Sequence, residues 1–121
     1  MSEHQEQVAV IQWFDLQYVD LKGRLFAVPN GARTSMGTAV KLKREGLRKG
    51  VPDLFLIYRT TKYTGLAIEM KDTKGKVSIE QTDWLAYLAS QGFRTAVCFG
   101  CDDARAVITD YLLEMHKTLF L

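Results

Sequence analysis

The sequence predicts one α/β domain, spanning residues 1–121, in which a mixed β-sheet is flanked by helices. Segments with helical spacing of apolar residues alternate with short apolar segments typical of strands, in the order α β α β β α β α. Such interleaving is typical of a sheet covered by helices. A length of 121 residues suits a single hydrophobic core. The composition, 47% hydrophobic and 25% charged, excludes a chain that is disordered by default.

The first half of the chain predicts a helix, a strand and a second helix. Residues 3–19 form the first helix, because apolar residues recur at intervals of three and four and Ser2 is a favourable N-cap. Residues 24–28 form a short strand that ends at Pro29. Residues 35–46 form the second helix. The apolar positions are Val8, Ile11, Phe14 and Tyr18 in the first helix, and Ala39, Val40 and Leu42, expected to face inward, in the second.

Two strands follow, joined by a short polar segment. Residues 54–58 are a continuous apolar run directly after Asp53, as in a strand buried on both faces. Residues 65–71 are a second apolar strand with charges at its far end. Because residues 59–64 are polar and few, we expect a hairpin-like connection and antiparallel pairing of the two strands.

The last third of the chain predicts a helix, a strand and a helix. The third helix covers 79–91, because Ser78 and Gln81 have the spacing of a capping box. The final strand covers 93–99, and the final helix covers 103–117.

The cysteines Cys98 and Cys101 have C-x-x-C spacing, which is found in zinc and redox sites. A zinc site needs about four ligands, and the sequence has no second cysteine pair. We therefore expect Cys98 to belong to a buried strand. Two reduced thiols, no secretory signal and no apolar run long enough to span a membrane predict a cytoplasmic protein.

Basic residues are clustered although the net charge is only +2. Residues 41–50 contain five basic side chains and one acid, and Lys62, Lys71, Lys74 and Lys76 follow within 62–76. Such clusters can neutralise the phosphates of a nucleic acid. A solvated protein surface is the alternative interpretation.

The charged end of the strand over 65–71 requires an explanation. Side chains alternate along a strand, so Glu69 and Lys71 point to the same face. Antiparallel pairing brings the beginning of the preceding strand, and therefore Asp53, beside them. Two close carboxylates repel each other, and a divalent cation such as Mg²⁺ or Mn²⁺ relieves that repulsion. These three residues therefore predict a metal-dependent hydrolytic site, with a structural ion-pair network as the alternative.

The segments Val51-Pro52-Asp53 and Glu69-Met70-Lys71 resemble the P-D…(D/E)-x-K signature of the restriction-endonuclease-like nucleases. More narrowly, the chain is similar to the VRR-NUC domains of that superfamily, which occur as stand-alone phage and bacterial proteins and at the end of a eukaryotic DNA-repair nuclease. The resemblance runs through nearly the whole chain. The remaining matching stretches are Glu3 with Gln7, Pro29-Asn30-Gly31 with Arg33, Leu42 to Gly46, Gly50 with Leu54, Gly75 to Ser78 with Gln81 and Trp84, and Gly92-Phe93.

The resemblance implies a role for each of several residues. Asp53, Glu69 and the backbone carbonyl of Met70 would bind the metal, Lys71 would be the catalytic lysine, and Gln81 would help to position the water or the metal shell. An acid on the first helix supports such sites. Glu3 fits the helical register best, four residues before Gln7, and Glu6 is the alternative. The residues expected to contact DNA are Arg33, Lys43, Arg44, Lys74 and Lys76.

The resemblance also implies a substrate. We expect a deoxyribonuclease dependent on Mg²⁺ or Mn²⁺ that selects branched DNA, such as four-way (Holliday) junctions or flaps. A symmetric junction requires two active sites, so we expect a homodimer. If the protein is phage-encoded, it would act in the cytoplasm of the host cell. Two alternatives are a non-catalytic basic DNA-binding module and a phosphoesterase that acts on a small molecule.

Overall fold

The computed structural model describes residues 1–29 and 35–119. Their order is helix, strand, helix, two strands, helix, strand and helix, as predicted, with one additional 3-10 turn, η1. The helices are α1 (Glu3–Gln17), α2 (Met36–Arg44), α3 (Ile79–Ser90) and α4 (Cys101–Leu119), and η1 covers Val19–Leu21. The strands are β1 (Leu25–Ala27), β2 (Leu54–Leu56), β3 (Leu66–Lys71) and β4 (Arg94–Phe99).

The strands form one mixed sheet in the order β1-β2-β3-β4. β1 pairs with β2 and β2 with β3 in antiparallel orientation, whereas β3 and β4 are parallel. The parallel pair needs a crossover, which α3 supplies. The predicted fold class and the predicted antiparallel pairing of the two central strands are therefore confirmed.

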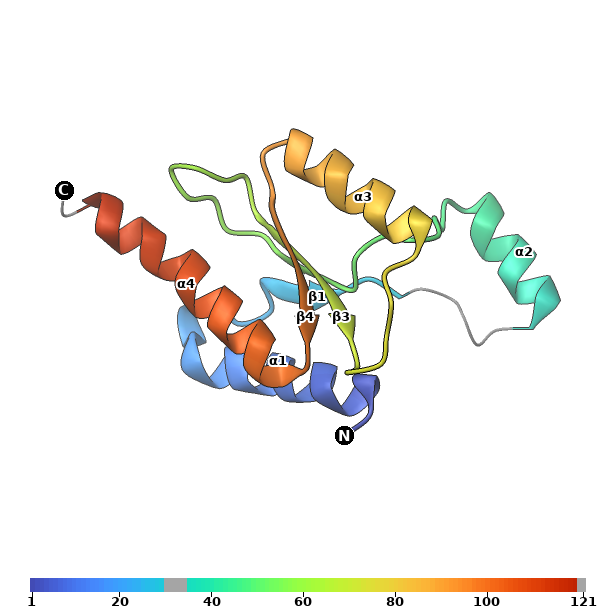
Figure 1. Cartoon of the computed structure of the whole chain (residues 1–121), viewed down its shortest axis with the longest axis horizontal. Helices are drawn as coiled ribbons and strands as arrows, with labels where there is room; N and C mark the ends of the chain where they lie inside the picture. Colours follow the sequence, from blue (N-terminus) through green and yellow to red (C-terminus); the bar gives the residue numbers. More distant parts are fainter. Residues whose placement is uncertain (30–34, 120–121) are drawn as a thin grey trace.

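One face of the sheet carries the main hydrophobic core. Alternate strand residues, among them Leu54, Ile68 and Met70, have no exposed surface and pack against α1 and α4. Phe14 of α1 and Tyr111 of α4 are likewise fully buried in this core. Figure 1 shows α1 and α4 lying together on one side of the sheet and α3 on the other. The opposite face, under α3, contains Glu69 and Lys71.

That second face is only partly covered, and this corrects one prediction. Residues 54–58 were expected to be buried on both faces, but β2 ends at Leu56, Phe55 is half-buried and Ile57 is 54% exposed. The reason is that α3 packs over β3 and β4, whereas no second described helix extends the layer over β1 and β2.

The helices differ from the predictions in their detail. The predicted N-cap Ser2 and the predicted Ser78–Gln81 capping box are confirmed. The expectation that Ala39, Val40 and Leu42 face a core is wrong, because α2 has no buried residue and Val40 is 54% exposed. The last helix begins at Cys101, two residues before the predicted start. No helix within the described ranges is long and apolar enough to cross a membrane.

Candidate active site

Asp53 lies directly opposite Glu69. In the β2–β3 ladder Leu54 pairs with Ile68, so the same register, continued by one residue, brings the two carboxylates together. The Oδ2 atom of Asp53 accepts a hydrogen bond of 2.7 Å from the backbone N–H of Met70, which has no exposed surface. This bond satisfies a buried donor and fixes the Asp53 side chain at the edge of the ladder.

The Glu69 carboxylate is buried, with 2% of the residue exposed. Its Oε2 atom accepts a hydrogen bond of 3.2 Å from Nε2 of Gln81 and lies 3.6 Å from Nζ of Lys71. Its Oε1 atom has no hydrogen-bond partner among the described residues. A buried carboxylate oxygen without a hydrogen-bond partner lowers the stability of the fold. The free Oε1 atom is thus placed to bind a cation or to accept a hydrogen bond.

Burial raises the pKa of Glu69 to about 8, from an ordinary value of 4.5. The neighbouring Asp53 carboxylate raises the pKa further, first because it can accept a hydrogen bond from the protonated Glu69 and then because the two negative charges repel each other. The Lys71 ammonium acts in the opposite direction, but its attraction is smaller than these two effects. Without another cation, Glu69 therefore holds a proton near neutral pH.

Lys71 ends β3 with its side chain largely covered, at 13% exposure. The following loop folds back over it. A Cβ atom at Gly75 would lie 3.1 Å from Cδ and 3.3 Å from Cβ of Lys71, so a glycine permits this close approach. The covered stem restricts where the ammonium can reach, which keeps it beside Glu69.

Gln81 reaches the site because it belongs to the cap of α3. Its Oε1 atom accepts a hydrogen bond of 2.9 Å from the backbone N–H of Ser78, and the Ser78 hydroxyl accepts one of 3.1 Å from the Gln81 N–H. The amide oxygen is thereby occupied, so the amide nitrogen faces Glu69. A capping box thus orients a side chain that contacts a predicted metal ligand.

The two acids of the first helix, Glu3 and Glu6, have different surroundings in the structure. Burial raises the pKa of Glu3, and the nearby carboxylate of Asp53 raises it further, whereas Lys71 lowers it. Glu3 is therefore close enough to these residues to interact with them electrostatically. Glu6 instead accepts a hydrogen bond of 2.5 Å from the backbone N–H of Cys101, at the start of α4. The placement favours Glu3 as the first-helix acid, and Glu6 joins α1 to α4.

The different surroundings of Glu3 and Glu6 predict different results for isosteric substitutions of the two residues. For the metal-dependent nuclease site that the sequence predicts, Glu3→Gln should slow DNA cleavage about 10- to 100-fold at limiting Mg²⁺, as for a group that supports a metal site. Glu6→Gln keeps an acceptor for the Cys101 N–H, so cleavage should stay near the wild-type rate. Glu6→Ala should lower the free energy of unfolding by about 1 kcal/mol, because it removes a helix cap. Cleavage rates across an Mg²⁺ titration, with urea unfolding alongside, test these expectations.

A stronger loss of cleavage in Glu6→Gln than in Glu3→Gln would contradict this assignment and make Glu6 the first-helix acid of the site.

Gly50 positions the Asp53 loop against α3. It has φ +90°, and a Cβ atom there would lie 2.6 Å from the backbone carbon of Glu80. Only glycine allows both the backbone conformation and the contact. The loop that carries Asp53 therefore touches the helix turn that carries Gln81, and Lys49 forms an exposed ion pair of 3.4 Å with Glu80 across the same contact. The sequence has no local signal for a contact between residues so far apart.

The residues predicted to contact DNA lie in different places. Lys74 and Lys76 are exposed in the loop after β3, beside Lys71. Lys43 and Arg44 are exposed on the last turn of α2. Arg33 lies outside the described residues.

The donor set fits a divalent cation that takes hard oxygen ligands. Among the side chains that the structure describes, those of residues 1–29 and 35–113, no three His, Cys, Asp or Glu are close enough to bind a metal by themselves. Asp53 and Glu69 would supply two carboxylate ligands, and a backbone carbonyl and water would complete the shell. Mg²⁺ characteristically binds through one or two carboxylates and keeps several waters. The unpartnered Oε1 atom of Glu69 is consistent with such a ligand.

The two cysteines are separate from this site. Cys98 is fully buried in β4, as predicted, and burial raises the pKa of its thiol to about 11. Cys101 is partly buried at the start of α4, and burial raises the pKa of its thiol as well. Both thiols are therefore poor nucleophiles at neutral pH.

Comparisons with known proteins identify the family of the chain. The VRR-NUC domain matches residues 1–102 of the chain. A solved structure of a VRR_NUC domain protein is similar, with a TM-score of 0.81 and 28% sequence identity over 94% of this chain and 90% of that one. No curated protein matches the sequence. Because the domain match spans most of the chain, the resemblance read from the sequence is confirmed, and the chain belongs to the VRR-NUC family of nuclease domains.

Proposed function

We propose that this protein is a DNA nuclease that hydrolyses phosphodiester bonds and depends on Mg²⁺ or Mn²⁺. One observation supports the proposal most strongly. A buried carboxylate, Glu69, faces a second carboxylate, Asp53, and keeps one oxygen without a partner in the described structure. Such a pair is unfavourable by itself and becomes favourable around a divalent cation.

The proposal assigns a role to each residue of the site. Asp53 and Glu69 would hold the metal, with the backbone carbonyl of Met70 as a further ligand. When bound, the cation supplies Lewis-acid activation of water and neutralises charge on the scissile phosphate. Lys71 holds the attacking water or contacts the phosphate, because its ammonium is beside Glu69 and its stem is covered. Gln81 holds Glu69 in one orientation through its amide nitrogen.

The substrate we propose is branched DNA, such as a four-way junction or a flap, cut by a homodimer. Cutting a symmetric junction on two strands needs two active sites related by a two-fold axis. Sedimentation of the protein with junction DNA at micromolar concentration should give the mass of two chains per junction. A mass corresponding to one chain would contradict this part of the proposal.

An alternative function is that of a DNA-binding module without catalysis. The observation in its favour is that Glu69 already has Lys71 and Gln81 as polar neighbours, which is also what a structural network would show. The unpartnered Oε1 atom favours the nuclease, because a purely structural network normally satisfies all of its buried atoms.

A cleavage assay distinguishes the two functions. Labelled duplex, flap and four-way-junction DNA are incubated with the protein, with Mg²⁺, with Mn²⁺ or with EDTA. The nuclease predicts cleavage only with metal, faster on branched DNA, and abolished in Lys71→Met. Binding to all three DNAs without cleavage under any condition would support the module.

The raised pKa of Glu69 predicts how metal and pH affect stability. In the metal-free protein the folded state keeps the Glu69 proton up to about pH 8, whereas the unfolded chain releases it near the ordinary value of 4.5. This contribution to the free energy of unfolding is therefore complete below pH 4.5 and is lost as pH rises toward 8. The loss is up to about 1.4 kcal/mol per pH unit.

Urea unfolding in EDTA between pH 5 and pH 8 measures this loss. The Glu69→Gln variant cannot ionise at this position, so its stability should fall less steeply with pH than that of the wild type. Added Mg²⁺ should stabilise the wild type most at high pH, because binding needs the ionised carboxylate. Equal pH slopes for wild type and variant would show that Glu69 is already ionised without metal.

A further inference from the structure

Helix α2 is attached to the domain only loosely. None of its side chains is buried, and Met36 and Val40 are 85% and 54% exposed. Figure 1 shows the helix projecting away from the layers formed by the sheet and the other helices. A helix of nine residues is marginal in water without tertiary contacts. A binding partner that covers α2 would therefore add stability that the domain does not provide.

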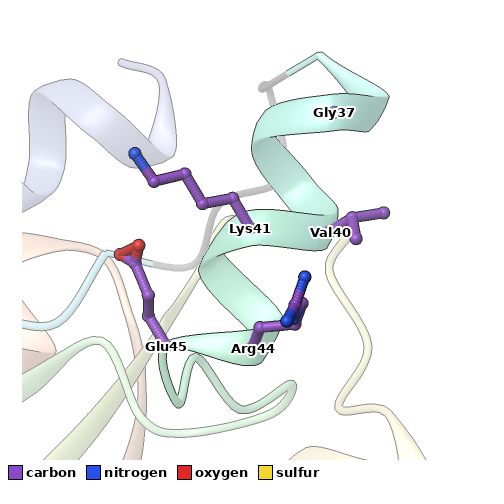
Figure 2. Close-up of a pocket in the computed structure, with 5 residues that line it drawn as sticks. All are labelled: Gly37, Val40, Lys41, Arg44 and Glu45. Atoms are coloured by element: carbon purple, nitrogen blue, oxygen red, sulfur yellow. The ribbon is translucent and has the colours of Figure 1, made fainter.

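One side of α2 lines an open hollow of about 480 Å³. Lys41 and Arg44 both line this hollow, and because they are three residues apart they lie on successive turns of the helix. Figure 2 shows both side chains extending from successive turns of α2, with no side chain at Gly37 in the turn above. Lys43, predicted from the sequence to contact DNA, is not among the residues that line the hollow.

The two cations of the hollow have no carboxylate partner in the part of the chain that the structure describes. The ion pairs found there are Lys49–Glu80, Lys71–Glu69 and Arg94–Asp110. Glu45 lines the same hollow without approaching either cation within 4 Å. Among the described residues the hollow therefore carries two positive charges and one negative charge, and neither cation is held in a direct ion pair.

We infer that this side of α2, through Lys41 and Arg44, binds the sugar-phosphate backbone of the DNA substrate outside the cleavage site. The inference rests on the proposed function and adds a substrate-binding surface to it. Arg44 precedes Asp53 by nine residues, so the two lie at most about 30 Å apart. That is about one turn of a DNA duplex, roughly 34 Å. The contacted phosphates thus lie within about one turn of the scissile bond.

A second copy of the chain is a weaker candidate for the partner of this surface. Residues 41–50 carry five basic side chains and one acid. A two-fold contact through the same surface would place these positive charges against their own copies, which is unfavourable. A polyanion such as DNA releases counterions when it meets the same charges.

The experiment measures DNA binding separately from cleavage. Fluorescence anisotropy with a labelled duplex of about 30 base pairs is recorded in EDTA over a range of salt concentrations, with a random second sequence for comparison. Lys41→Ala/Arg44→Ala is compared with Lys22→Ala/Arg24→Ala, which removes two exposed cations outside α2 and outside the basic segments 41–50 and 62–76. Circular dichroism checks that both double variants are folded.

The inference predicts that the slope of log K against log salt decreases by about 2 in Lys41→Ala/Arg44→Ala, since each lost phosphate contact reduces it by about 1. Affinity near 0.15 M salt should fall about 10- to 100-fold for both sequences, while the control changes less than about 3-fold. With Mg²⁺, KM for cleavage should rise while kcat stays the same.

Equal losses in the two double variants would overturn the inference, because they would show only a diffuse charge effect. A loss of dimer mass in Lys41→Ala/Arg44→Ala alone would also overturn it, because α2 would then contact a second copy. If the wild type binds DNA with the predicted slope but never cleaves it, the proposed nuclease function fails while the binding surface is retained.

Discussion

Replacing Asp53 with asparagine is expected to slow DNA cleavage at least about 1,000-fold while the fold stays intact. Asparagine removes the negative charge that would bind the metal, a loss of about 4 kcal/mol of transition-state stabilisation. Its amide oxygen can still accept the hydrogen bond that the Met70 N–H donates to Asp53. Single-turnover cleavage with saturating Mg²⁺, together with urea unfolding, measures the two properties separately.

Asp53→Ala is the informative companion, because it removes both functions of the side chain. The buried N–H of Met70 then has no acceptor, which should lower the free energy of unfolding by about 1–3 kcal/mol. Asp53→Asn should lose much less stability and the same amount of activity. Wild-type cleavage by Asp53→Asn would refute the metal-ligand role, and equal stability of the two variants would refute the structural one.

Replacing Gly50 with alanine is expected to destabilise the protein by about 3 kcal/mol and to slow cleavage. The backbone at Gly50 has φ +90°, which strains any residue with a Cβ atom. The added Cβ atom would also lie 2.6 Å from the backbone of Glu80 and push the first turn of α3 away. Gln81 belongs to that turn, so its hydrogen bond to Glu69 should be lost with it.

Two other glycines separate the causes of this effect. Gly46 has φ +109° but open space around its Cα atom, so Gly46→Ala should show the backbone strain alone, about 1–2 kcal/mol. Gly37 lies inside α2 with open space and no positive φ, so Gly37→Ala should stabilise the protein by up to about 1 kcal/mol. The midpoints of urea unfolding of the three variants test this order of stabilities. A Gly50→Ala midpoint equal to that of Gly46→Ala would show that the contact with Glu80 has no effect.

The centre of the site could be predicted because it depends on local rules. Alternation along a strand puts Glu69 and Lys71 on one face, and a short loop after residue 58 favours antiparallel pairing. These two rules together bring Asp53 opposite Glu69, as the register shows. The capping box was also predictable, because Ser78 and Gln81 are three residues apart.

The parts that could not be predicted depend on contacts between distant residues. The hydrogen bond from Cys101 to Glu6 joins residues 95 positions apart, and no local pattern indicates it. The packing of Gly50 on Glu80 likewise arises only once α3 is placed on the sheet. The periodicity of residues 35–46 predicts an inward face for helix α2, but Val40 is exposed because none of the described layers of the domain covers it. Periodicity predicts a helix but does not show what lies next to it.

Crystals soaked in Mn²⁺ and measured for anomalous scattering would test the central claim most directly. The account predicts one strong peak between Asp53 and Glu69, at about 2.1 Å from a carboxylate oxygen of each and within reach of the Met70 carbonyl. The Asp53→Asn crystal should lose this peak. A wild-type protein that cleaves DNA with Mn²⁺ but shows no peak between Asp53 and Glu69 would contradict the account.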